Sequence, residues 1–304
     1  MLGGLHDPDQ LALLYREADV YYRLNDIKSA NDRHEYAFNL QRNGTPDDQV
    51  DATIRLAKWY EANRHQSAAR DLYRRALELT NAHAPNSEVQ RAQLHRAIAW
   101  TYRSQYYPGT KATEAKTPFR VLTPKPYGIV WRDIEGMTID PWSREILLRA
   151  RIALQRSRDT LAGQDSLPSE EMSQTLLDLG DWHLLTRKYG RAFSTYADLY
   201  KLLQTSAPSQ LESILGKAEL LHMRDLGSAV AIPGHTSPTY GVIELEVAVN
   251  RMGVARNVRT VRLDPPHLSD RRFRAAMRVA RFRPAIIDGV PTRTENVRVT
   301  YIFD

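Results

Sequence analysis

The chain has 304 residues, more than a single hydrophobic core usually holds, so we expect two domains. With 42% hydrophobic and 26% charged residues, the composition is that of an ordinary globular protein and excludes disordered and fibrous classes. There is no cysteine, which excludes disulfides, thiolate nucleophiles and cysteine-ligated metal centres.

The net charge of +6 is distributed unevenly along the chain. Residues 240–304 contain 12 arginines, no lysine and 7 acidic residues, whereas the rest of the chain has 30 basic and 29 acidic residues. Nearly all the excess positive charge therefore belongs to the last fifth of the chain. This difference predicts two modules with different surfaces.

The first three-quarters of the chain is predicted to be helical, and small residues recur in it at fixed offsets. A small residue in the middle of a helix lets an antiparallel partner helix approach closely. Three sets follow this pattern: Ala18, Tyr21, Ile27, Ala30 and Ala37; Ala57, Tyr60, Ala69, Tyr73 and Ala76; and Gly180, His183, Tyr189, Ala192, Tyr196 and Leu199. These segments resemble the tetratricopeptide repeat (TPR), a helix–turn–helix of about 34 residues. The alternative is a generic helical bundle.

Residues 1–226 are therefore predicted to form a TPR-like helical domain with one irregular insertion. The insertion, about 104–140, has four prolines and several aromatic residues, and we interpret it as packing against the fold, with a ligand-contacting arm as the alternative. Helices resume at Pro141, and the last amphipathic helix is predicted from the spacing of Leu211, Ile214, Leu215, Ala218 and Leu221. Residues 227–240 are rich in small and helix-breaking residues and are predicted to be a linker.

From Gly241 the hydrophobic period changes from 3.6 to 2, which predicts strands. Residues 241–249 and 254–263 form the first two, joined by a turn at Gly253, and a helix follows Ser269. A last strand ends the chain. The predicted fold class is α+β: a TPR-like helical solenoid followed by a small β-β-α-β domain, residues 241–304.

Several residues of this second domain carry a resemblance. They are Gly241, Gly253, the run Ala275-Ala276-Met277, the run Phe282-Arg283-Pro284-Ala285, the turn Asp288-Gly289 and the terminal Phe303. Together they resemble the carboxy-terminal domain of the TonB family of energy transducers. The resemblance implies a periplasmic, cell-envelope protein in transport, whose last strand pairs with an extended segment of an outer-membrane transporter.

The residues that the resemblance assigns to strand pairing are Val297, Arg298, Val299, Thr300, Tyr301, Ile302 and Phe303. An exposed edge strand offers unpaired N–H and C=O groups to an extended peptide. The repeat domain is expected to bind a second protein in its groove. The start, Met1–Pro8, shows no signal peptide, and any membrane association is expected only through a segment that this sequence does not include, so a cytoplasmic location is the alternative.

A basic patch is predicted on the helix of the second domain, where Arg271, Arg274, Arg278 and Arg281 share one face. We interpret it as a solvated face, with a partner-binding patch as the alternative. Nucleic acid is not expected as a partner, because the patch lacks interleaved aromatic residues and a known nucleic-acid motif.

The sequence predicts no enzyme. Phosphate-binding glycine loops, a nucleophile elbow and a compact histidine metal motif are all missing from it, so neither a cofactor nor a metal is expected. The chain is therefore predicted to be a non-enzymatic interaction protein. The alternative is a structural or assembly scaffold whose second domain caps the repeat domain or makes it a homo-oligomer.

Overall fold

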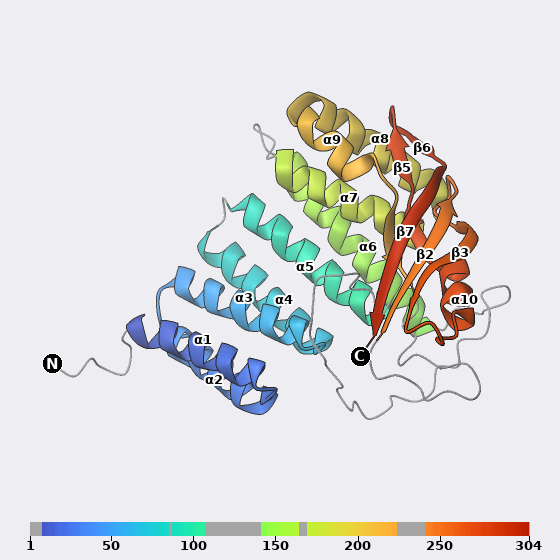
Figure 1. Ribbon diagram of the computed structural model, residues 1–304. Coiled ribbons are helices and arrows are strands. Elements are labelled where there is room, and N and C mark those ends of the chain that lie inside the picture. The colour runs from blue at the N-terminus through green and yellow to red at the C-terminus, as the bar shows by residue number, and fades with distance from the viewer. Residues whose placement is uncertain (1–7, 85–86, 107–140, 164–168, 224–240, 304) are drawn as a thin grey trace. The chain divides into compact units, whose positions relative to one another are not determined.

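The computed structural model describes residues 8–84, 87–106, 141–163, 169–223 and 241–303 (Figure 1). The chain divides into two compact units. Unit 1 consists of residues 1–105 and 149–175, and unit 2 of residues 106–148 and 176–304. The predicted linker 227–240 and nearly all of the predicted insertion 104–140 lie outside the described residues.

Unit 1 is helical throughout its described residues. Its helices are α1 (Pro8–Arg23), α2 (Ile27–Gln41), α3 (Pro46–Ala62), α4 (Gln66–His83) and α5 (Glu88–Tyr106). Two more helices, α6 (Pro141–Ala162) and α7 (Ser169–Leu185), contribute residues to both units. The start of α3 is fixed by its capping residues. Thr45 and Asp48 form a reciprocal capping box around Pro46, which satisfies the first free amides of the helix.

The three predicted repeats are helical hairpins: α1–α2, α3–α4, and α7 with α8 (Tyr189–Ser206). The repeating small residues lie where the helices cross, because all of the following have an exposed fraction of 0%: Ala18, Ala30, Ala37, Ala57, Ala69, Ala76 and Ala192. The helical part of the chain therefore has a TPR-like repeat architecture.

The turns of these three hairpins have the same geometry. Each has one residue with a left-handed φ, at Asn25 (62°), Arg64 (64°) and Arg187 (59°). In each, the next amide donates back to the carbonyl five residues earlier, with N···O distances of 2.9, 2.8 and 2.8 Å for residues 26, 65 and 188. This is the Schellman arrangement, which satisfies free carbonyls at a helix end. One turn geometry thus recurs at one position of each repeat.

The end of the helical region differs from the prediction. Helix α9 (Pro208–Leu215) stops at Gly216, and β1 (Glu219–His222) follows, so the predicted helix is wrong at Ala218 and Leu221. Strand β1 pairs antiparallel with β4 (Arg281–Arg283). Leu221, within this strand, is 5% exposed. Strand β1 is held by its pairing with β4, which is distant in the sequence, and no local pattern indicates such pairing.

The carboxy-terminal region is a small antiparallel-sheet module. Strands β2 (Gly241–Val249), β3 (Ala255–Asp264) and β7 (Thr294–Phe303) form a sheet in the order β3-β2-β7. Helix α10 (Arg271–Val279) covers one face, because Phe273 and Met277 share a buried core with Ile243, Leu245 and Val247. Alternation along β2 therefore supplies the apolar face, as its period predicts.

The β-β-α-β order is too simple for this module. Besides β1 and β4, the described residues include a separate hairpin of β5 (Ala285–Ile287) and β6 (Val290–Thr292). Its turn is the predicted Asp288-Gly289 pair, with φ values of 53° and 74°, as a two-residue hairpin turn with two left-handed residues requires. At Gly253, φ is 70° and a Cβ would lie 1.9 Å from the Phe282 carbonyl oxygen, so only glycine fits.

No helix in the described ranges is both long and apolar enough to span a bilayer.

Candidate interaction surfaces

Strand β7, which was predicted to pair with a partner, lies at one edge of the three-stranded sheet. Among the described strands it pairs only with β2. That pairing runs without a register shift from Gly241 opposite Phe303 to Val247 opposite Val297. The seven predicted pairing residues, Val297 to Phe303, therefore form one regular edge segment.

The opposite edge of the sheet, β3, is irregular. Its register against β2 shifts between Glu244 and Leu245 and again between Glu246 and Ala248. Asn257 lies within it with a left-handed φ of 52°. Bulges of this kind turn an edge away from an incoming strand. Strand β7 has one such irregularity, at Asn296 (φ 56°), where its register against β2 shifts between Val247 and Val249. Its segment 297–303 is regular and is the part of the two edges suited to strand addition.

The two faces of β7 differ in chemistry. Val297, Val299 and Tyr301 pack against the core, and the Tyr301 ring lies 5.1 Å from that of Phe273, measured between ring centroids. Arg298, Thr300 and Ile302 are exposed on the other face, Ile302 by 57%. An added strand would therefore meet apolar side chains on one face and mainly polar ones on the other.

An acidic residue flanked by arginines lies on that second face of the sheet. The Glu246 side chain, 9% exposed, is paired across the sheet with Arg259 on β3, whose Nε donates to Oε1 at 2.8 Å. On β7, the Arg298 Nε lies 3.9 Å from the other carboxylate oxygen. Opposite charges on neighbouring strands stabilise a sheet.

The predicted basic patch is only partly present. Arg271 and Arg278 are exposed on α10, and Arg274 forms an ion pair with Asp270 at 3.2 Å. Arg281 is not on the helix, which ends at Val279. It begins β4, and its Nη1 donates to the backbone carbonyls of Val279 and Ala280, both at 3.1 Å. Helical spacing placed Arg281 wrongly because strand pairing ends the helix before it.

A buried charged cluster joins the sheet module to the α7–α8 hairpin within unit 2. The Arg283 side chain is 4% exposed, and its guanidinium pairs with Asp181 of α7 at 3.1 Å and with Glu219 of β1. The Tyr196 hydroxyl of α8 donates to the same Asp181 carboxylate at 2.7 Å. Each buried charge thus has an opposite charge and hydrogen bonds, which burial requires.

Sequence reasoning assigned no role to this cluster. Gly180 permits it, since a Cβ there would lie 2.5 Å from the Tyr196 ring. The arginine belongs to the Phe-Arg-Pro-Ala run that carried the TonB resemblance, and this was the one available signal.

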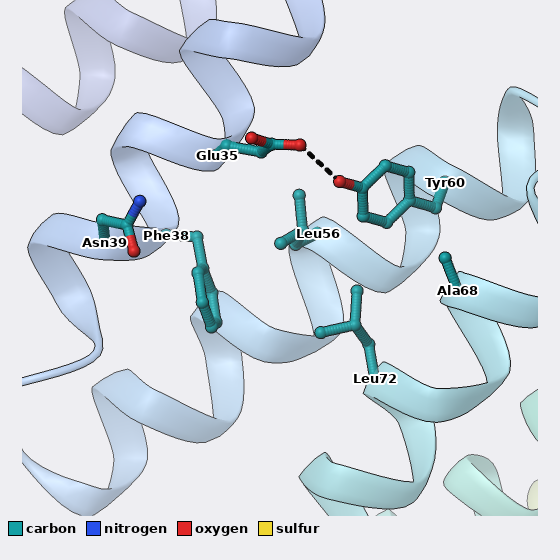
Figure 2. A pocket seen from close by; sticks show the side chains of 7 residues that line it. All are labelled: Glu35, Phe38, Asn39, Leu56, Tyr60, Ala68 and Leu72. Atoms are coloured by element: carbon teal, nitrogen blue, oxygen red, sulfur yellow. Dashed lines mark hydrogen bonds between the residues drawn. The ribbon is translucent and has the colours of Figure 1, made fainter.

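A groove in unit 1 was also not predicted. It has a volume of about 310 Å³ and is open to solvent, with α2 and α4 along its sides and α3 at its base (Figure 2). Figure 2 shows the side chains that line it: Glu35, Phe38, Asn39, Leu56, Tyr60, Ala68 and Leu72. Because α2 and α4 are the second helices of adjacent repeats, the groove is a product of repeat stacking.

Metal-binding geometry is not found in the described part of the chain, where no three His, Asp or Glu side chains gather in a way that could hold an ion.

Comparisons with known proteins give fold likenesses at low identity. No family model matches the chain, and no curated protein does either. Similar solved structures include BtubC (BKLC) from P. vanneervenii, 14% identical over 77% of this chain and 75% of that chain, with a TM-score of 0.45. A putative kinesin light chain of Podosopora anserina with nearly identical TPR-like repeats is 13% identical over 69% and 84%, with a TM-score of 0.45.

The apo form of RapI is 12% identical, also with a TM-score of 0.45. The match covers 69% of this chain and 61% of RapI. At these values the likenesses say nothing further about what this chain does.

Proposed function

We propose that the chain is a non-enzymatic protein-interaction scaffold in which a TPR-like region and a strand-pairing module each bind a partner. The observation that carries the second half of this proposal is the regular edge of β7. From Val297 to Phe303 it has no bulge and no proline, two of the features with which sheets prevent edge pairing, and its one charged side chain is Arg298. An extended peptide that adds to this edge would satisfy its outward-facing amides and carbonyls.

The partner that the TonB resemblance implies is an extended segment of an outer-membrane transporter, and its location would be the periplasm. We propose both on that resemblance alone. The arrangement of the module is compatible with such a role, since a three-stranded sheet covered by one helix leaves β7 with a single described neighbour.

The test uses two proline variants of the full chain, Val299→Pro and Thr300→Pro. Successive residues of a strand direct their N–H groups to opposite sides, so one variant removes an amide from the β2 ladder and the other removes an outward-facing amide. The variant that has lost the outward-facing amide is identified by its near-normal thermal unfolding. We expect it to bind synthetic transporter segments at least about tenfold more weakly by isothermal calorimetry. Unchanged binding by this folded variant would reject strand addition.

A second candidate function is supported by a different observation. Strand β1, which follows α9, pairs with β4, and Arg283 of β4 is buried against Asp181 of α7. The module thus covers the last helical hairpin, as a terminal cap of a repeat array must. In this assembly-scaffold alternative the module caps the repeats and binds no peptide.

Light scattering and calorimetry on the full chain separate these two functions. A monomer that binds a transporter segment supports strand addition. A chain that is folded, binds none of the segments, and is either a monomer or an obligate dimer supports the structural role.

A further inference from the structure

The groove on unit 1 has an apolar end. Phe38 of α2, Leu56 of α3 and Leu72 of α4 line it, and Leu56 is 6% exposed at its base. Ala68 is an exposed residue on the rim, and its side chain, a single methyl group, does not narrow the groove. The space is open along the surface rather than enclosed, and its volume of about 310 Å³ is at the lower limit of small-molecule sites. It therefore suits one or two side chains of a longer ligand.

The other end of the groove carries a negative charge. Glu35 accepts hydrogen bonds from the Tyr60 hydroxyl at 2.5 Å and from Asn31 Nδ2 at 2.7 Å, both at Oε1. Figure 2 shows the Glu35 and Tyr60 side chains meeting above the apolar residues. In the part of the chain that the structure describes, no lysine or arginine forms an ion pair with Glu35, and its Oε2 accepts no hydrogen bond.

The chemistry of the two donors leaves Glu35 as the charge of this groove. Burial, and then the adjacent Glu35 carboxylate, raise the pKa of Tyr60 to about 12, so the phenol remains a neutral donor at physiological pH. Asn31 is neutral at every pH. A partly buried carboxylate held only by neutral donors gains most from a cation, because charge-assisted hydrogen bonds are roughly twice as strong as neutral ones.

We infer that this groove binds a peptide segment of a partner protein in which a lysine or arginine lies next to a leucine-sized apolar residue. The apolar side chain enters between Phe38, Leu56 and Leu72, and the cationic group pairs with Glu35. The inference rests on the proposed scaffold function, and it assigns to the second helices of the first two repeats a binding surface separate from β7. The apolar contact supplies affinity, and the ion pair selects the sequence.

The experiment measures fluorescence anisotropy of a labelled peptide, Gly-Ser-Leu-Lys-Leu-Lys-Leu-Lys-Ser-Gly, titrated with the full chain. The matched probe replaces each lysine by glutamate. Two variants test the groove. Glu35→Gln removes the charge and keeps an oxygen for Tyr60 and Asn31. Ala68→Phe fills the groove from its exposed rim. Glu78→Gln, at an exposed carboxylate on the same helix as Ala68, is the control.

We expect the lysine probe to bind at least about tenfold more tightly than the glutamate probe. Glu35→Gln and Ala68→Phe should each weaken its binding by about fivefold or more, while Glu78→Gln leaves it unchanged. Thermal melts check that each variant folds. If Glu35→Gln does not fold, Ala68→Phe still tests the groove. The inference is overturned if the lysine probe does not bind at about 1 mM, if both probes bind equally, or if the folded variants bind like the wild type.

The folded proline variant at β7 distinguishes this inference from the proposed function. It should bind the lysine probe with unchanged affinity, because β7 is not part of the groove. Failure of the lysine probe alone removes the groove and leaves strand addition at β7 intact. Failure of both the lysine probe and the transporter segments removes the scaffold function itself.

Discussion

The second hairpin, α3–α4, and the last one, α7–α8, use the same framework for different purposes. Tyr73 and Tyr196 lie four residues after the small residues Ala69 and Ala192, and both are buried. Each donates to a carboxylate on the first helix of its own hairpin: Tyr73 to Glu61 at 2.7 Å, and Tyr196 to Asp181 at 2.7 Å.

The two carboxylates lie at different positions of the repeat, since Glu61 precedes its tyrosine by 12 residues and Asp181 by 15. In the last hairpin Asp181 also holds the buried Arg283 of the sheet module. In the second hairpin burial, followed by the charge of Glu61, raises the pKa of Tyr73. In the last hairpin the carboxylate that binds the tyrosine is thus also the attachment point for another kind of structure. The hairpin turn has the same geometry in both hairpins, whereas Gly180 in the last hairpin replaces Ala57 of the second.

The largest effect is expected from breaking that attachment. Arg283→Met leaves Asp181 buried without its cation, and removing one partner of a buried pair costs about 3–5 kcal/mol of unfolding free energy. The measurement is urea unfolding of the full chain, followed by hydrogen exchange of the β2 and β7 amides. Its control is Arg75→Met in the second hairpin, an exposed ion pair with Glu78 whose loss should cost about 0.5 kcal/mol or less. Equal losses in the two variants would show that the cluster does not hold the module.

A smaller effect is expected at the glycine of the last hairpin. In Gly180→Ala the new methyl group would meet the Tyr196 ring, which packs at 2.5 Å from that position, so we expect a loss of about 1–3 kcal/mol. The second hairpin tolerates alanine at the equivalent Ala57. The control is Gly190→Ala in α8, where a Cβ would meet no atom within 4 Å. That substitution should be neutral or stabilising by up to about 1 kcal/mol in thermal unfolding.

Local patterns in the sequence predicted much of this fold. Alanine offsets located the hairpins, and alternation along Ile243, Leu245 and Val247 located a central strand, because both patterns repeat within one element. The turns were harder, since their left-handed residues are Asn25, Arg64 and Arg187 rather than glycine.

Features built by distant residues were not predictable in this way. Arg283 and Asp181 are 102 residues apart in the sequence, and β1 exists only because β4 pairs with it. The groove needs side chains from three helices, and none of its members is unusual alone. The β7 edge was assigned from a resemblance, and the regular pairing that distinguishes it from β3 became visible only in the sheet.

The smallest effect is expected in the pH dependence of the unfolding free energy. The helical repeats of unit 1 contain histidines with lowered pKa values, whereas unit 2 contains the ion pair of Arg283 and Asp181. Burial lowers the pKa of His34 from 6.5 to about 4, where its ring stacks on Trp59 with centroids 4.1 Å apart. Burial, together with Arg156 and Arg91, likewise lowers that of His95 to about 4. Between pH 6.5 and 4 the unfolded chain therefore binds more protons than the folded one. The unfolding free energy has its full value above pH 6.5 and falls as the pH drops toward 4, by about 1–2 kcal/mol per histidine for these partly exposed rings.

His34→Phe keeps a ring against Trp59 and should remove about half of this pH dependence in urea unfolding at pH 7 and pH 4.5. His83→Gln, at the end of α4, is the control and should keep it. An equally steep loss of stability in His34→Phe would place the pH sensitivity elsewhere in the chain.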